Sequence, residues 1–264
     1  MLSQLSSCDS TTETKIINEN PIQWLLPSSL HEASGLAISG PQSVYVHNDE
    51  LGEIYEFNIL SGSTTKLASI SWPPVEEDFE GIAVTANSIY LMTSSGELFE
   101  INDIETNETH QIVGARRIDT RLKNICEFEG LHHLDNKLLM PCKEDLQEVG
   151  NIRFRIFAFD ITSETISEFL SLNISEIAGV KQMAATAFEA TRDHYYIVTE
   201  GYLVMIDRTT LESDSIRLNA QLHRQVEGIA LFPNGKIILV EDNRRGLARL
   251  TLYTNLDELI SANF

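Results

Sequence analysis

A short motif occurs five times along the chain and constrains the fold more than any other feature of the sequence. Each copy begins with a small or acidic residue, which is usually followed by glycine and then by mostly apolar residues: Ser34-Gly35-Leu36-Ala37, Glu80-Gly81-Ile82-Ala83, Glu129-Gly130-Leu131-His132, Glu227-Gly228-Ile229-Ala230 and a degenerate copy, Thr186-Ala187-Phe188-Glu189. The first three glycines, at positions 35, 81 and 130, are 46 and 49 residues apart. Periods of about 40–50 residues with several short strands are typical of the blades of a β-propeller.

Each copy is followed, after a short turn, by a β-rich segment that ends in polar residues, such as 44–49 and 237–243. Turn-forming sequences separate the expected strands, among them Ser61-Gly62 and Pro233-Asn234-Gly235. We therefore predict an all-β fold, a single β-propeller of four-stranded blades. Five blades are countable, and six is the alternative. One short helix is expected over residues 256–262.

The last copy is followed by only enough residues for two further strands. The apolar segment 22–26, which precedes the first copy, is a candidate for the missing outer strand. A ring closed by strands from both ends of the chain has no exposed sheet edge, so we expect this N-terminal strand to complete the last blade.

The first 15 residues are polar, and we expect a disordered tail over 1–15 and the propeller domain over 16–264. No apolar stretch is long enough for a transmembrane helix. Leu5-Ser6-Ser7-Cys8 reads like the end of a bacterial lipoprotein signal whose cysteine carries the lipid, although the apolar segment that should precede it is missing. The sequence thus favours an exported protein, periplasmic or lipid-anchored through Cys8, with a cytoplasmic protein as the alternative.

Cys126 and Cys142 flank an expected hairpin turn at Asp135-Asn136. Reflection of the chain about this turn brings the two cysteines close enough for a disulfide. Two buried free thiols remain the alternative, because cysteine is also a common core residue.

The chain carries a formal net charge of −20, from 19 basic and 39 acidic side chains. A field of this sign repels nucleic acids and anionic membranes, and it favours cations, basic partners or simple solubility. We therefore expect no nucleic-acid partner. A monomer is expected as well.

The residue before the repeat glycine comes close to the propeller axis in every blade. In the five copies this residue is Ser34, Glu80, Glu129, Thr186 or Glu227. Three converging carboxylates repel one another unless they are protonated or bridged by a cation. Because hydroxyl and carboxylate oxygens suit Ca²⁺, the pattern predicts a calcium site at the axis. The alternative is a polar channel that holds only water.

The second strand of each blade returns to the face where the first began, so its polar end lies near the same mouth of the channel. Four of these strand-end residues are candidates for ligand binding: His47, Asp49, Lys143 and Glu241. The adjacent His132 and His133 should point to opposite faces of a strand, which argues against a shared ligand. Known nucleophile, phosphate-loop and zinc-protease motifs are absent, so catalytic residues stay unknown.

Several of these segments, in order, resemble a known family. Glu32-Ala33-Ser34-Gly35-Leu36-Ala37, Asp78-Phe79-Glu80-Gly81-Ile82-Ala83, Cys126-Glu127-Phe128-Glu129-Gly130-Leu131 and Val226-Glu227-Gly228-Ile229-Ala230 are similar to bacterial propellers of the SdiA-regulated type, a group that borders esterase-like phytases and gluconolactonase-like (SMP-30) proteins. The resemblance covers roughly residues 30–250 and implies an exported propeller with a central calcium. Members are often described as six-bladed.

A weaker resemblance is to calcium-dependent apyrases, five-bladed propellers that hydrolyse nucleoside diphosphates at a central calcium. Their central positions follow the order Ser, Glu, Glu, Ser, Glu, and this chain has Ser34, Glu80, Glu129, Thr186 and Glu227 in that order. Apyrases need basic side chains to hold phosphates, and here Lys143 and Arg244 are the candidates.

Three functions are consistent with the sequence. The first is a calcium-binding propeller that presents its channel mouth to a small ligand or a protein. The second is a calcium-dependent hydrolase of phosphate or carboxylic esters. The third is an acidic interaction protein for a basic partner.

Overall fold

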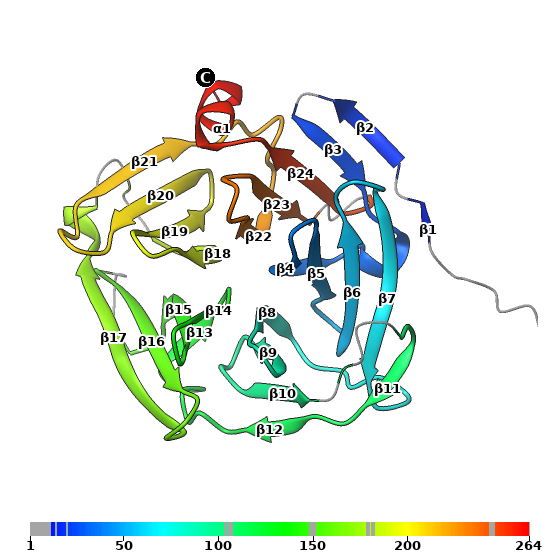
Figure 1. Cartoon of the computed structure of the whole chain (residues 1–264). Coiled ribbons are helices and arrows are strands. Elements are labelled where there is room, and N and C mark those ends of the chain that lie inside the picture. Colours follow the sequence, from blue (N-terminus) through cyan, green and yellow to red (C-terminus); the bar gives the residue numbers. More distant parts are fainter. Residues whose placement is uncertain are drawn as a thin grey trace, which may run out of the picture.

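The repeat motif lies at the innermost position of each of five sheets, and these sheets stand around one axis (Figure 1). The structure is a computed structural model that describes residues 12–13, 15–19, 21–102, 104, 108–147, 152–177, 180, 183–242 and 246–263. Within these ranges the sheets form five blades, so the chain is a five-bladed β-propeller. The prediction of a propeller is confirmed, and the alternative of six blades is wrong.

The strands of each blade follow one another from the axis outward. The first blade contains β4 (Ala33–Gly40), β5 (Ser43–Asn48), β6 (Glu53–Asn58) and β7 (Ser63–Ile70), and the second contains β8 (Phe79–Val84), β9 (Ser88–Thr93), β10 (Leu98–Asn102) and β12 (Arg116–Ile118). In the third, β13 (Cys126–Phe128) and β14 (His132–Leu134) share the innermost position, followed by β15 (Lys137–Asp145), β16 (Arg153–Asp160) and β17 (Thr165–Asn173). The fourth contains β18 (Ala185–Ala190), β19 (His194–Thr199), β20 (Tyr202–Asp207) and β21 (Ser213–Arg217). The fifth contains β22 (Val226–Leu231), β23 (Ile237–Glu241) and β24 (Arg249–Tyr253).

The fifth blade is completed by the N-terminal segment. Strand β3 (Ile22–Leu25) pairs antiparallel with β24, with Trp24 opposite Leu250, and β2 (Lys15–Glu19) pairs with β3. The short strand β1 (Thr12–Glu13) pairs instead with β7 at the outer edge of the first blade. The predicted closure is therefore confirmed, and one N-terminal segment links the last blade to the first. Strands thus begin at Thr12, inside the segment 1–15 for which we expected a disordered tail.

The segment between β10 and β12 links the first two blades. Strand β11 (Gln111–Val113) runs parallel to β7 of the first blade before the chain returns to the second blade as β12. Edge strands are therefore shared at both junctions of the first blade.

The hydrophobic core consists of clusters between neighbouring blades. Trp24 of the fifth blade, for example, packs edge-to-face on Phe57 of the first, with ring centroids 5.2 Å apart. Both side chains are almost completely buried. Each such cluster is therefore built from residues of two adjacent blades.

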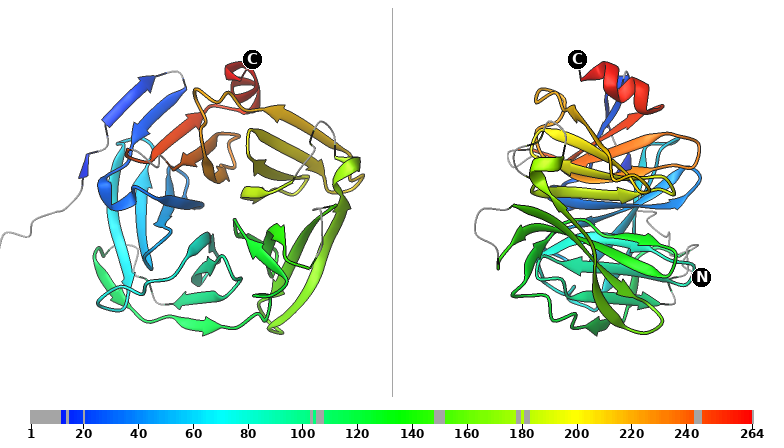
Figure 2. Two further views of the ribbon diagram at one scale, coloured as in Figure 1. Left: turned by 180° about the vertical axis from the view of Figure 1, so that it is seen from behind. Right: turned by 90° about the vertical axis from the view of Figure 1, so that its left-hand side faces the viewer.

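The short helices lie outside the blades. The helix α1 (Leu256–Ala262) lies at the outer rim, as expected from the sequence, and buries Leu259 against the fourth and fifth blades (Figure 2). Its first turn is capped by Asn255, whose side chain accepts a hydrogen bond from the backbone of Glu258. Two 3₁₀ turns, η1 (Ser28–Leu30) and η2 (Ile174–Glu176), complete the described elements. Within the described ranges, no helix is long and apolar enough to cross a membrane.

Cys126 and Cys142 form a disulfide with a Cα–Cα distance of 5.6 Å. The bond joins the paired strands β13 and β15 of the third blade. Of the two alternatives that the sequence left open, the structure shows the bonded one.

Candidate functional site

The repeat glycines allow the inner strands of neighbouring blades to touch. A Cβ atom on Gly81 would lie 2.8 Å from the backbone nitrogen of Leu131, and one on Gly228 would lie 3.0 Å from that of Leu36. Since real Cβ atoms are rarely so close to backbone, no larger residue fits at these positions without a shift of the strands. The same contacts bring the residues before the glycines to one end of the axis.

Most of the predicted ring residues line a cavity of about 310 Å³ at that end, which we call the acidic cavity. It is lined by Glu32, Ala33, Ser34, Asp49, Glu80, Glu129, Lys143, Gln225, Glu227 and Asp242. Six of these residues are acidic, and Lys143 is the basic one. Four of the five predicted ring positions therefore meet here, together with Asp49 and Lys143 from the predicted mouth.

Thr186 is the ring residue that does not reach the acidic cavity. Its hydroxyl donates a 2.7 Å hydrogen bond to the backbone oxygen of Val226 in the next blade. It lines a second hollow of about 340 Å³, the side hollow, which shares Glu129, Lys143, Gln225 and Glu227 with the acidic cavity.

Few contacts inside the acidic cavity compensate the carboxyl groups. The hydroxyl of Ser34 donates to Glu80 Oε2 at 2.7 Å, and Lys143 Nζ lies 2.7 Å from Glu129 Oε2. Asp49 Oδ1 and Glu227 Oε2 are buried without a hydrogen-bond partner. Unpartnered buried oxygens carry a desolvation cost that a bound cation or water would remove.

The pKa values of these carboxyls are shifted upward. Burial, together with the neighbouring Glu80 and Glu227, raises the pKa of Glu129 to about 9. Burial likewise raises the pKa of Glu80 to about 8, and burial together with Glu32 raises that of Asp49 to about 7. Burial also raises the pKa of Glu227. Without a cation the cavity therefore holds protons near neutral pH, because burial penalises the ionised carboxylates and they repel one another.

The pKa of Lys143 is also shifted upward, which for an amine favours the charged form. Burial lowers its pKa, but the charges of Glu129, Glu80 and Glu227 outweigh this effect and raise it above the usual value. The ammonium group is thus an internal counter-ion for the ring.

The donor set suits a hard cation, since it offers carboxylate, hydroxyl and amide oxygens and no thiolate. In the part of the chain that the structure describes, however, no three His, Cys, Asp or Glu side chains are already arranged around one metal position. Metal binding would therefore require loss of protons and release of Glu129 from Lys143.

Two of the predicted ligand-binding residues do not reach the cavity. His47 is completely buried, and its Nε2 would lie 2.4 Å from a Cβ atom on Gly35, so its ring fills the space that this glycine leaves. Burial lowers the pKa of His47 to about 4, which keeps the ring neutral. Its Nδ1 lies 3.0 Å from the backbone oxygen of Asn48.

Glu241 is also buried away from the cavity. Its carboxylate contacts His223 Nδ1 at 2.7 Å and forms an ion pair with Arg249. Both His47 and Glu241 lie on second strands, where alternate side chains point away from the axis and into the contacts between blades. Position at the end of a strand was thus an insufficient criterion for a mouth residue.

Several residues that line the two cavities were not predicted from the sequence. Glu32 and Gln225 each lie two residues before a ring position and contribute polar groups to the acidic cavity. His223 and Arg224 line the side hollow. The shared spacing of Glu32 and Gln225 relative to the glycine was a usable signal, whereas nothing in the local sequence marks His223. Arg244, the other predicted phosphate contact, lies outside the described residues.

No protein-family model matches the sequence, and no curated protein matches it. Similar solved structures do exist. The PQQ-bound aldose sugar dehydrogenase from Streptomyces coelicolor covers 93% of this chain and 99% of its own, with a TM-score of 0.54 and 12% identity. The WD40 propeller domain of Doa1 covers 94% and 99%, with a TM-score of 0.52 and 7% identity. Glutaminyl cyclase from Myxococcus xanthus covers 91% and 97%, with a TM-score of 0.50 and 16% identity. At these identities the common property is the β-propeller fold.

Proposed function

We propose that the acidic cavity binds calcium and presents it at the channel mouth to a small ligand or a protein partner. The observation that carries this proposal is the convergence of Glu80, Glu129 and Glu227 beside a single lysine. A cation would relieve their mutual repulsion and satisfy the unpartnered oxygens of Asp49 and Glu227. Calcium accepts 6–8 oxygen ligands in flexible geometry, which suits a mixed set of carboxylates, a hydroxyl and an amide.

The resemblance to propellers of the SdiA-regulated type supports the same proposal, because that resemblance implies a central calcium. The residues that carry it, Ser34, Glu80, Glu129 and Glu227, line the acidic cavity.

Calorimetric titration tests the proposal directly. We expect chelator-treated protein to bind one Ca²⁺ per chain and to release protons, so that the heat depends on the ionisation enthalpy of the buffer. The variant Glu80→Gln should bind calcium more weakly. Glu100→Gln is the matched control, since Glu100 lies on β10, away from the cavity, and its carboxylate accepts hydrogen bonds from Tyr90 and Arg116. Absence of binding at millimolar calcium would overturn the proposal.

A calcium-dependent hydrolase is the second candidate, and the side hollow favours it. This hollow adjoins the ring and places Lys143 and Arg224 together, where they could hold an anionic ester group. A bound calcium would act there as a Lewis acid. Turnover of phosphoesters or lactones that requires calcium, and that Arg224→Gln slows without changing calcium affinity, would establish this activity. Binding without turnover would favour the presentation role.

We also propose that the protein is exported. The disulfide between Cys126 and Cys142 supports this, because such bonds persist mainly in oxidising compartments. The proposed lipid anchor at Cys8 lies outside the described residues and stays a prediction. Globomycin-sensitive processing and labelling of the full-length precursor with a fatty acid would test it.

A further inference from the structure

A second cavity lies at the opposite end of the inner strands. Its residues come from the carboxyl-terminal parts of these strands and from the turns that follow, whereas the ring residues lie near the amino-terminal parts. Glu227 and Leu231, for example, are separated by four residues of β22, or roughly 13 Å at the usual rise of a strand. The cavity has a volume of about 520 Å³ and shares no lining residue with the acidic cavity.

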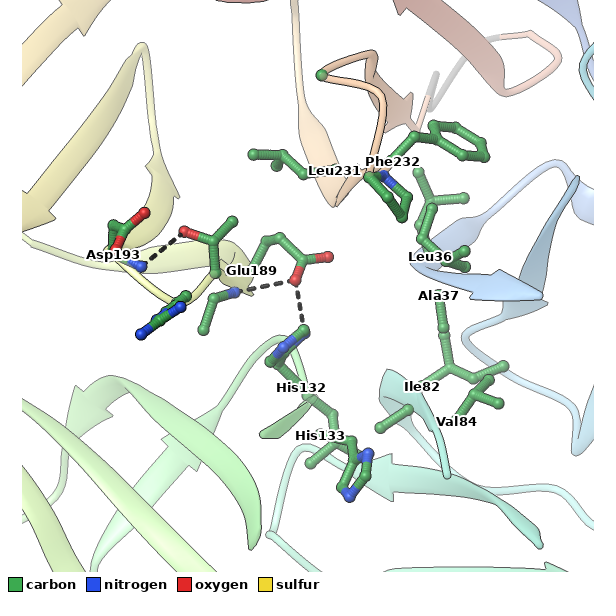
Figure 3. Close-up of a pocket in the computed structure, with 18 residues that line it drawn as sticks. Leu36, Ala37, Ile82, Val84, His132, His133, Glu189, Asp193, Leu231 and Phe232 are labelled. Atoms are coloured by element: carbon green, nitrogen blue, oxygen red, sulfur yellow. Dashed lines mark hydrogen bonds and ion pairs between the residues drawn. The ribbon is translucent and has the colours of Figure 1, made fainter. Parts of the chain in front are cut away.

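The walls of the second cavity differ in character from one side to the other (Figure 3). One side carries apolar side chains, among them Leu36, Ile82, Leu231 and Phe232. The other side carries His132, Glu189 and Asp193. Arg192 also lines the cavity. A mostly apolar cavity of this size with a few polar groups on one side is the usual form of a small-molecule site.

His132 is held in one orientation by a contact between blades. Its Nδ1 lies 2.7 Å from Glu189 Oε1, and this oxygen also accepts a 3.0 Å hydrogen bond from the backbone nitrogen of Ala190. The side chain of Glu189 is 8% exposed and that of His132 is 21% exposed. Because a carboxylate can only accept, the neutral imidazole carries its proton on Nδ1 and has its free lone pair on Nε2.

The adjacent His132 and His133 both line the cavity, but they point in different directions, as alternation along a strand predicts (Figure 3). His132 contacts Glu189 of the fourth blade, whereas His133 lies beside the backbone of Val84 in the second blade. Both lie in β14, a strand of three residues.

We propose that the second cavity binds a small uncharged molecule with an aromatic or aliphatic body and a hydroxyl group that donates to His132 Nε2. The apolar wall would cover the body, and the imidazole would orient the hydroxyl. Anions are disfavoured because Glu189 and Asp193 outnumber Arg192 in the lining and the net charge of the chain is −20. A cation would be repelled by Arg192 and desolvated by the apolar wall, and Glu189 is already engaged by His132. This site does not depend on the calcium proposed for the acidic cavity.

The test uses 2-naphthol and 2-methoxynaphthalene, which share a body but differ in the donor hydroxyl. We expect saturable, one-site binding of 2-naphthol by fluorescence titration, with 2-methoxynaphthalene about fivefold to tenfold weaker, as for the loss of one hydrogen bond. His132→Phe keeps a planar ring but removes the acceptor. It should weaken 2-naphthol binding to the level of the methyl ether and leave binding of the ether unchanged.

Two controls make the result specific. His31→Phe changes an exposed histidine elsewhere and should leave both affinities unchanged, while Glu129→Gln should do the same because it lies in the other cavity. If His132→Phe does not fold, Glu189→Ala is the second variant, and it should weaken 2-naphthol binding selectively by releasing the imidazole. Equal affinities for the two probes, no saturable binding, or loss of binding in Glu129→Gln would each overturn the proposal.

Discussion

Glu129 is the ring residue whose replacement separates a metal site from simple packing. Glu129→Gln keeps the shape of the side chain and removes an ionisable carboxyl group from the acidic cavity. Calcium at about 100 times its dissociation constant should stabilise the wild type by ~2.7 kcal/mol, which corresponds to about 5–10 °C in Tm. We expect the variant to lose most of this shift and to exceed the wild type in Tm in chelator, as followed by circular dichroism.

The sign of the change in chelator is the decisive part of that prediction. If Glu129 contributed only packing, its replacement would lower the Tm both with and without calcium. Glu127→Gln, an exposed glutamate two positions earlier, should behave as wild type under both conditions.

Lys143 should show the opposite behaviour. Lys143→Met removes the internal counter-ion of Glu129, so the metal-free protein should be less stable and the calcium-induced rise in Tm should be larger than in the wild type. Lys137→Met, on the same strand β15 but paired with Asp160 at the outer surface, is the control. An unchanged calcium response in Lys143→Met would show that the lysine does not compete with the ion.

The residues of the acidic cavity were predictable to the extent that one sequence position repeats. The four ring residues that line the cavity could be found because each stands directly before the repeat glycine of its own blade. His47 and Glu241 could not be placed, because a position at the end of a second strand does not specify on which face of the blade the side chain lies. In both blades the pairing with the first strand shifts at the ring position, between Ala33 and Gly35 and between Val226 and Gly228, so the ring residue is the extra residue of a bulge.

The contact between inner strands can be tested at the level of the element. In Gly228→Ala, the new Cβ would meet Val240 at 2.6 Å and the backbone of the first blade at 3.0–3.1 Å. We expect a loss of about 1–3 kcal/mol in the free energy of unfolding in urea, as for other overpacked sites. Gly114→Ala is the matched control, since a Cβ there meets nothing within 4 Å. Equal stability of the two variants would mean that the strands move apart without cost.

The order of strands followed from the repeat, but the break in the third inner strand did not. Glu129 lies between β13 and β14, and Gly130 adopts a φ of +85° that favours glycine. In sequence this copy of the motif looks like the others. Contacts between blades, such as His132 with Glu189, were equally hidden, because they join residues with no fixed spacing along the chain.

The whole molecule should become less stable as pH rises in the absence of calcium. Folding raises the pKa of Glu129 from 4.5 to about 9 and that of Glu80 from 4.5 to about 8. It raises the pKa of Asp49 from 3.8 to about 7. The folded state therefore binds more protons than the unfolded state between these values, and stability that is fully present below them is lost as pH rises. We expect Tm in chelator to fall between pH 5 and pH 9.

The comparison that isolates the cavity uses a double variant. In Glu80→Gln/Glu129→Gln the fall in Tm with pH should be shallower than in the wild type, because these two side chains no longer titrate. Some fall should remain, because Asp49 still titrates. Calcium should raise the Tm of the wild type more at pH 9 than at pH 6, since the ion replaces protons. A calcium response that is independent of pH would contradict the upward pKa shifts.

Closure of the ring by the N-terminal segment is the last property of the whole molecule that can be tested. Removal of residues 1–27 deletes β1, β2 and β3, exposes the edge of β24 and takes Trp24 out of the core between the fifth and first blades. Loss of a buried tryptophan alone costs about 3–5 kcal/mol, so we expect the shortened chain to be unfolded or to aggregate at its open edge. Removal of residues 1–11 leaves every described strand in place and should keep the Tm of the full chain. A synthetic peptide of residues 12–27 should restore cooperative melting to the shortened chain, because β24 and β7 would regain their partners. If the shortened chain melts as the full chain does, the strand pairing of Trp24 with Leu250 does not close the propeller.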